Sequence, residues 1–195
     1  MWDGRLVTSK VDPWREAETW VARHAARVHD ARTVLVFGIA GGFHVDRLCQ
    51  RFPGKRIVVV EAESAFLSSP SQLIRDLAQS MTIHAGVDPP ALLRLAEVEA
   101  AVKDIYVVLT HPQASRINPA YYRHASAVLL GRDARSFNDL SLIRGSACRL
   151  PLSTNPADEP ASAISVRTIA DAVAPLATPV TDETRAWLCL RELLT

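Results

Sequence analysis

Residues 33–48 constrain the fold more than any other part of this chain. They read TVLVFGIAGGFHVDRL, which is a short apolar run, a glycine-rich segment and then residues with helical spacing. A second apolar run follows about twenty residues after the glycines and ends at Glu61. The pattern predicts a strand over 33–37, a turn over 38–42, a helix over 43–52 and a second strand over 56–61.

The turn and the acid together form the layout of a Rossmann-type unit. Such a turn lets a nucleotide approach the backbone, the following helix presents free N–H groups, and the acid accepts hydrogen bonds from ribose. We therefore predict Gly38, Ala40, Gly42, His44 and Glu61 as cofactor-binding residues, although the methyl group of Ala40 narrows the room for a nucleotide. Two alternatives stay open. In the first, the glycines serve only to make the turn compact. In the second, His44 has a local structural role, which is the interpretation that we favour for this histidine.

The rest of the chain continues to alternate strands with helices. This order is typical of a three-layer α/β/α domain with a mainly parallel sheet, a Rossmann-like fold. We divide the chain into a helical segment over 1–32, a Rossmann-like domain over 33–150 and a loop with a helical extension over 151–195 that packs on the domain. The further helices are expected over 13–30, 69–80, 89–102, 119–132, 165–175 and 181–194, and the further strands over 81–85 and 104–109.

Composition narrows the class of protein. The 22 basic and 21 acidic residues leave a net charge of +1, so no overall field draws the chain to nucleic acid. No apolar run approaches the roughly 18 residues of a membrane span, and the start lacks the order of a secretory signal. The three cysteines are scattered, and no histidine pair has the spacing of a local metal chelate. We expect a cytoplasmic protein with no metal, no membrane span and no nucleic-acid partner.

The segment over 110–122, THPQASRINPAYY, is the second distinctive feature. It follows the strand over 104–109, at the edge where open α/β sheets bind ligands. We predict His111 as a further cofactor-binding residue, with Arg116 and Tyr121 holding a substrate anion. The alternative is a strand-to-helix connection, capped by Asn118, whose tyrosines pack on the sheet.

These segments together resemble the N-terminal Rossmann-like domain of the motility accessory factors, bacterial flagellin glycosyltransferases that transfer nonulosonic acids. Ala40 departs from the family pattern. In the family this domain precedes one that resembles pterin diphosphokinases and carries the presumed transferase chemistry, and this chain ends where that domain would begin. The resemblance therefore implies an accessory module that binds a nucleotide or nucleotide sugar. The matching positions are Gly38, Gly42, Phe43, His44, Glu61, His111, Pro112, Asn118, Pro119, Tyr121 and Tyr122.

Two other functions fit the same pattern. Class I S-adenosylmethionine-dependent methyltransferases share the strand, the glycine turn and the acid after the second strand. Against them, the segment after the fourth strand lacks an Asn-Pro-Pro-Tyr-like motif, and no terminal strand hairpin is evident. A degenerate Rossmann scaffold that binds a protein partner through its C-terminal helices is the third hypothesis. The sequence leaves open whether the chain is an enzyme.

Overall fold

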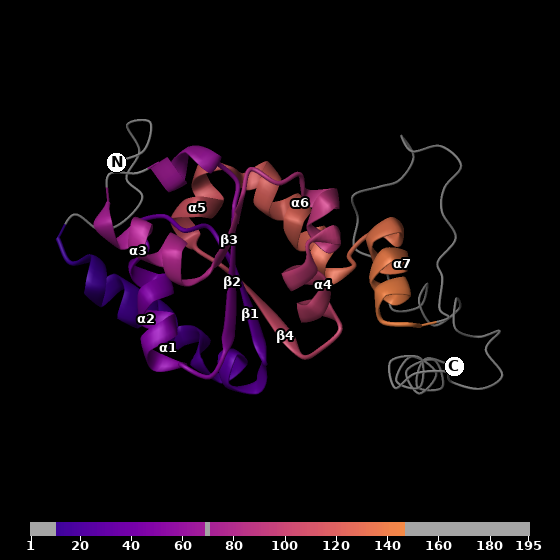
Figure 1. Cartoon of the computed structure of the whole chain (residues 1–195), viewed down its shortest axis with the longest axis horizontal. Helices are drawn as coiled ribbons and strands as arrows, with labels where there is room; N and C mark the ends of the chain where they lie inside the picture. Colours follow the sequence, from indigo (N-terminus) through magenta and orange to yellow (C-terminus); the bar gives the residue numbers. More distant parts are fainter. Residues whose placement is uncertain (1–10, 69–70, 147–195) are drawn as a thin grey trace.

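The computed structural model describes residues 11–68 and 71–146. Its strands form one sheet in which every pairing is parallel, in the order β3–β2–β1–β4. Helices cover both faces, which confirms the predicted three-layer Rossmann-like α/β fold (Figure 1). The strands are β1 (Thr33–Phe37), β2 (Arg56–Glu61), β3 (Thr82–Ala85) and β4 (Tyr106–Thr110).

The central strands are apolar on both faces because helices pack on each side. All five residues of β1 are buried, and alternate side chains along the strand point to opposite faces. Val34 and Val36 join the core under one layer of helices, whereas Leu35 and Phe37 join the core under the other. Continuous apolar runs of this kind are expected for a parallel sheet covered twice.

Three helices cover the first face: α1 (Pro13–Asp30), α2 (Phe43–Arg51) and α3 (Gln72–Ser80). Asp12 begins α1 by accepting a hydrogen bond from the Arg15 N–H at 2.9 Å, as an N-cap does. The buried stripe of α1 includes Trp20, Val21 and Val28, which belong to the same core as the sheet. Thus α1, which we assigned to a separate N-terminal segment, packs on the domain.

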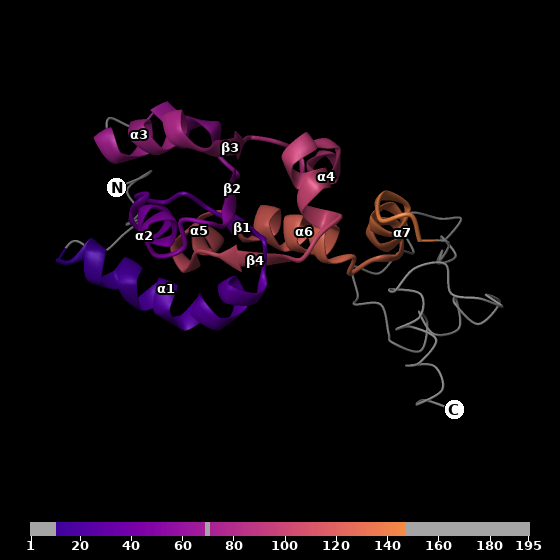
Figure 2. The same ribbon diagram turned by 60° about the horizontal axis from the view of Figure 1, so that its bottom comes forward.

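The second face is covered by η2 (Pro89–Arg94), α4 (Ala96–Val102) and α6 (Pro119–Leu130), and α7 (Ala134–Ile143) packs against them. Figure 1 and Figure 2 show these elements on one side of the sheet and α1, α2 and α3 on the other. Two short helices complete the described chain, η1 (Ser64–Ser68) after β2 and α5 (Pro112–Ile117) after β4.

Some element boundaries differ from the prediction. The predicted helix over 89–102 is divided at Leu95, which has extended backbone angles. The helix expected from residue 69 begins at Gln72, and β4 lies at 106–110 instead of 104–109. We did not predict α5 or α7, because a single turn after a proline and a helix with few periodic apolar residues give weak local signals. The helices predicted over 151–195 lie outside the described residues.

Within residues 11–68 and 71–146, no helix combines the length and the apolar character that crossing a bilayer requires.

Candidate functional site

The candidate site lies at the carboxyl edge of β1 and β4, where the strand order changes direction. Gly38, Ala40 and Gly42 all have positive φ angles, of 88°, 45° and 84°. Glycine adopts this left-handed region without steric cost, whereas an alanine there is strained. The turn therefore has the left-handed backbone that glycine permits, and Ala40 adopts it despite its methyl group.

Gly38 makes a close contact with the segment after β4. A Cβ added to Gly38 would lie 2.0 Å from the Ala114 Cβ of α5, far closer than two non-bonded carbon atoms can approach. At Gly42, an added Cβ would meet the Leu77 side chain of α3 at 3.0 Å. Both glycines thus face other parts of this chain. The space that a nucleotide would occupy over the turn in a Rossmann domain is bounded here by α5.

The Glu61 carboxylate binds the glycine turn itself. Its Oε2 accepts a hydrogen bond from the Ile39 N–H at 2.8 Å. Its Oε1 accepts from the Tyr122 hydroxyl at 2.8 Å and from the Glu63 N–H at 3.1 Å. The side chain is buried, since Glu61 is only 2% exposed. Its position at the end of β2 is as predicted, but its oxygens are engaged within the protein.

The electrostatics of this cluster follow from its burial. Loss of hydration raises the pKa of Glu61, and the hydrogen bonds from Ile39, Glu63 and Tyr122 oppose that rise. Burial, and then the nearby carboxylate of Glu61, also raise the pKa of Tyr122. The phenol therefore stays protonated and donates to the carboxylate, while its oxygen accepts from the Ala62 N–H at 3.1 Å. The cluster holds β1, β2 and α6 together at the carboxyl edge.

A second buried cluster joins the histidines of the turn and of β4 to α1. The rings of His44 and His111 stack with centroids 4.1 Å apart, and the Trp20 ring packs edge-on against His44 at 5.0 Å. His44 Nε2 lies 3.0 Å from the Gly38 carbonyl oxygen. Because a carbonyl only accepts, this nitrogen carries the proton. His44 thus has the structural contact that we favoured, and it is 2% exposed.

Burial keeps both histidines neutral. Loss of hydration lowers the pKa of His111 to about 4. The pKa of His44 is held well below its usual value by burial and by the adjacent His111 ring. Among the described residues, neither His111 Nδ1 nor Trp20 Nε1 has a hydrogen-bond partner. Buried polar atoms without partners are uncommon and often mark a place for water or a ligand.

An open hollow of about 440 Å³ lies beside these two rings, between α1 and the start of α5. We call it the α1 hollow. Trp20, His111 and Glu16 line it, together with the exposed side chains of Arg15 and Arg23. A much smaller space of about 10 Å³ lies deeper, between Glu16, Gly41, His44 and His111, and holds no more than one water molecule. Among the described residues, an accessible part of the carboxyl edge therefore lies on the α1 side.

The remaining predicted residues lie apart from this hollow. The Tyr121 hydroxyl donates to the Val87 carbonyl oxygen at 2.8 Å, and burial raises the pKa of Tyr121 to about 12. Arg116 is exposed on α5, near Gln113. His84 Nε2 on β3 lies 3.3 Å from the Glu97 carboxylate. In the described part of the chain, no group of three or more His, Cys, Asp or Glu side chains is placed to hold a metal ion.

Sequence reasoning missed Trp20, Arg15, Arg23 and Ala114 as members of the site. Their local spacing indicates only a helix stripe for Trp20 and solvated faces for the arginines. No local signal identifies them, because they reach the carboxyl edge only when α1 and α5 pack on the sheet.

Fold and site together define a Rossmann-like three-layer α/β protein whose glycine turn is packed against its own chain. Comparisons with protein-family models, with curated proteins and with solved structures found no match.

Proposed function

We propose that this chain is a cytoplasmic, accessory Rossmann-like module that binds a nucleotide-type anion in the α1 hollow and does not itself catalyse a reaction. The main support is the pair of buried ring nitrogens without partners, Trp20 Nε1 and His111 Nδ1. An indole N–H only donates, so it suits a phosphate or hydroxyl oxygen. Arg15 and Arg23 line the same hollow and can pair with a phosphate, although Asp12 and Glu16, which also line it, balance their charge.

The resemblance of residues 33–125 to motility accessory factors extends this proposal to a process. It makes a nucleotide sugar the preferred ligand and flagellin glycosylation with nonulosonic acids the proposed context. In that context the module would deliver or sense the sugar donor, and another protein would perform the transfer.

The methyltransferase is the second candidate, and the contacts of Glu61 weigh against it. In that class the acid after the second strand binds the ribose of S-adenosylmethionine. Here both carboxylate oxygens already accept hydrogen bonds from Ile39, Glu63 and Tyr122. A ribose would have to displace bonds that hold the turn together. We therefore expect no methyl transfer and at best modest affinity for S-adenosylmethionine.

A thermal-shift panel of CMP, a CMP-sugar, NAD and S-adenosylmethionine tests the proposal. A ligand present at 100 times its dissociation constant stabilises the folded state by about 2.7 kcal/mol. We expect the CMP-sugar to raise Tm most. Trp20→Phe, which removes the indole N–H but keeps a ring, and Arg23→Ala should each weaken that effect. Arg56→Ala is the matched control, because Arg56 is exposed at the opposite edge of the sheet.

Three outcomes distinguish the candidates. A low-micromolar dissociation constant for S-adenosylmethionine would favour the methyltransferase hypothesis. A shift with the CMP-sugar that survives Trp20→Phe and Arg23→Ala would place the ligand elsewhere. No shift with any member of the panel would favour the third hypothesis, a scaffold for a protein partner.

A further inference from the structure

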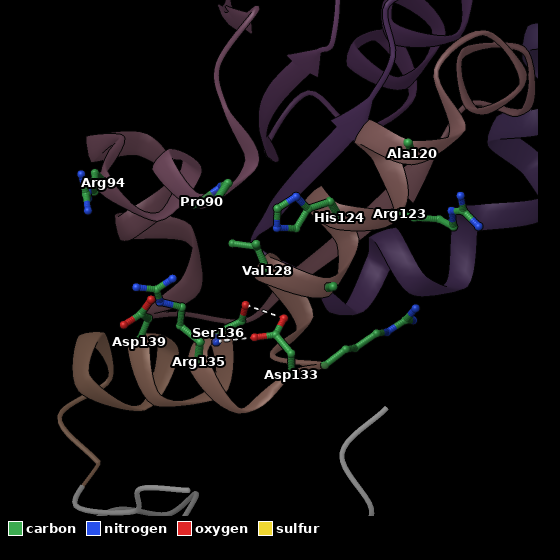
Figure 3. A pocket seen from close by; sticks show the side chains of 12 residues that line it. Pro90, Arg94, Ala120, Arg123, His124, Val128, Asp133, Arg135, Ser136 and Asp139 are labelled. Carbon is green, nitrogen blue, oxygen red and sulfur yellow. Dashed lines mark hydrogen bonds between the residues drawn. The ribbon is translucent and has the colours of Figure 1, made fainter. Parts of the chain in front are cut away.

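A larger hollow lies on the second face of the sheet, remote from the α1 hollow. It has a volume of about 990 Å³ and lies between η2, α6 and α7. We call it the arginine groove, after Arg94, Arg123, Arg132 and Arg135, which line it together with His124. Figure 3 shows His124 and Val128 on α6 facing the side of η2, whereas Arg123 extends from the other side of α6.

The charges of the groove are unbalanced. None of its four arginines forms an ion pair or side-chain hydrogen bond with another residue of the described chain. Elsewhere arginines have such partners: Arg27 donates to the Val108 carbonyl oxygen and Arg144 to the Val102 carbonyl oxygen. A guanidinium group has five N–H donors in a rigid fork that fits phosphate and carboxylate. Several unpaired forks around one hollow therefore favour an anionic occupant.

The acidic residues of the groove only partly offset this charge. Asp133 caps α7: its Oδ1 accepts from the Ser136 N–H and its Oδ2 from the Ser136 hydroxyl, both at 2.8 Å. That carboxylate is thus committed to the first turn of the ten-residue helix α7. Asp139, nearly two turns further along α7, is the other acid in the lining. Four guanidinium groups against these two carboxylates leave the groove positive.

The size and lining of the groove indicate the kind of anion. Its volume of about 990 Å³ is at the upper end of the range for small-molecule sites, roughly 300–1,000 Å³. Pro90, Ala120, Ala127 and Val128 provide apolar surface between the cations. Extended nucleic acid is a poorer fit, because the whole chain has a net charge of only +1 and binding along a backbone needs a longer basic surface.

We propose that the arginine groove is a binding site for a small organic anion that carries at least two phosphate or carboxylate groups. One anionic group pairs with Arg94 and Arg135, and another pairs with Arg123 on α6 or with Arg132 in the turn between α6 and α7. The apolar side chains on α6 contact the part of the ligand between them. This site is independent of the α1 hollow and of the function proposed for it.

Calorimetric titration of the full chain with tripolyphosphate and with citrate tests the proposal and separates phosphate from carboxylate ligands. At least one probe should bind with a dissociation constant below 1 mM, on the order expected when several guanidinium groups contact one anion. Arg135→Glu should weaken that binding at least tenfold. Arg56→Glu is the matched control, because it makes the same charge change at an exposed position outside the groove, and it should weaken binding less than twofold.

Other results would overturn the proposal. If Arg135→Glu and Arg56→Glu weaken binding equally, the probes are attracted only by the net charge of the protein. If neither probe binds, the proposed site does not exist. If single-stranded oligonucleotides bind more tightly as their length increases, the groove is a nucleic-acid surface instead. Circular dichroism checks that each variant folds. If Arg135→Glu does not fold, Arg94→Ala replaces it, since Arg94 is exposed on η2 and pairs with the same anionic group, so a tenfold loss is again expected.

Discussion

Gly38 lies where β1, β2 and α5 meet. Its N–H donates to the Val60 carbonyl oxygen at 2.9 Å, its carbonyl accepts from His44, and Ala114 fills the space that a side chain at this position would need. A residue with this φ angle and no room for a Cβ has to be glycine for two separate reasons, strain and space. Gly38 meets the first condition with a φ of 88°.

Replacing Gly38 by alanine should therefore lower the free energy of unfolding by at least about 2 kcal/mol, the sum of left-handed strain and a forced shift of α5. Urea unfolding followed by circular dichroism measures this change. Gly54→Ala is the control, because nothing lies within 4 Å of a Cβ added there, and it should cost little. Equal stability of Gly38→Ala and the unchanged protein would contradict the close approach of Ala114.

Glu61→Gln should also destabilise the protein, by about 1.5–3 kcal/mol, the range for hydrogen bonds to a charged group. The glutamine side chain has the same size, but only its amide oxygen accepts hydrogen bonds, whereas both oxygens of the Glu61 carboxylate accept them. The comparison is Glu18→Gln, which loses an exposed pair with Arg51 and should cost under about 1 kcal/mol. An unchanged unfolding curve for Glu61→Gln would contradict a structural role for this carboxylate and favour the prediction that Glu61 binds a ligand.

At the scale of elements, α5 and α6 fix the carboxyl edge. Asn118 ends α5 and begins α6: its Oδ1 accepts from the Tyr121 N–H at 3.3 Å, and its Nδ2 donates to the Glu63 carboxylate at 3.2 Å. One side chain therefore caps α6 and ties it to the segment after β2. This contact places the Tyr122 hydroxyl beside Glu61.

Asn118→Ala should lower the free energy of unfolding by about 1–2 kcal/mol, the usual effect of losing an N-cap plus a polar contact. Asn118→Ser keeps a capping hydroxyl but loses the bond to Glu63, so it should cost less than alanine does. Thermal unfolding of the three proteins gives the order. A serine variant as unstable as the alanine variant would mean that the cap contributes nothing.

At the scale of the whole molecule, the buried histidines make stability depend on pH. The pKa of His111 is about 4 in the folded protein and about 6.5 in the unfolded chain. As pH falls below 6.5, the unfolded chain takes up a proton that the folded protein does not, so stability falls. His44 acts in the same direction. The pKa of Glu61 is raised in the folded protein, so as pH falls toward 4.5 the folded protein takes up this proton before the unfolded chain does. Stability then rises, which offsets part of the loss caused by the histidines.

We expect His111 alone to remove about 2 kcal/mol of stability between pH 7 and pH 5. Urea unfolding at both pH values measures the difference, and His111→Leu should reduce it. His29→Leu is the control, since the His29 side chain is 84% exposed on α1, and it should leave the difference unchanged. The same pH dependence in His111→Leu as in the unchanged protein would show that His111 does not titrate as described.

The sequence by itself determined the fold class, the positions of the strands and the place of the glycine turn. These depend on apolar runs buried on two faces and on the backbone freedom of glycine, which are local properties that the order of residues displays. For the same reason β1 and β2 have the predicted bounds, whereas the break at Leu95 and the helix α7 do not follow from local spacing.

Only the tertiary structure decided what the candidate site residues contact. Glu61 and Tyr122 are 61 positions apart in the chain, and their hydrogen bond follows from the packing of α6 on the second face of the sheet. Trp20 meets His111 because α1 crosses the face of the sheet beside β4. Such contacts depend on the geometry of packed layers, and no spacing within one segment records them. That geometry directs Glu61 to the turn and leaves the α1 hollow as the accessible side of the edge.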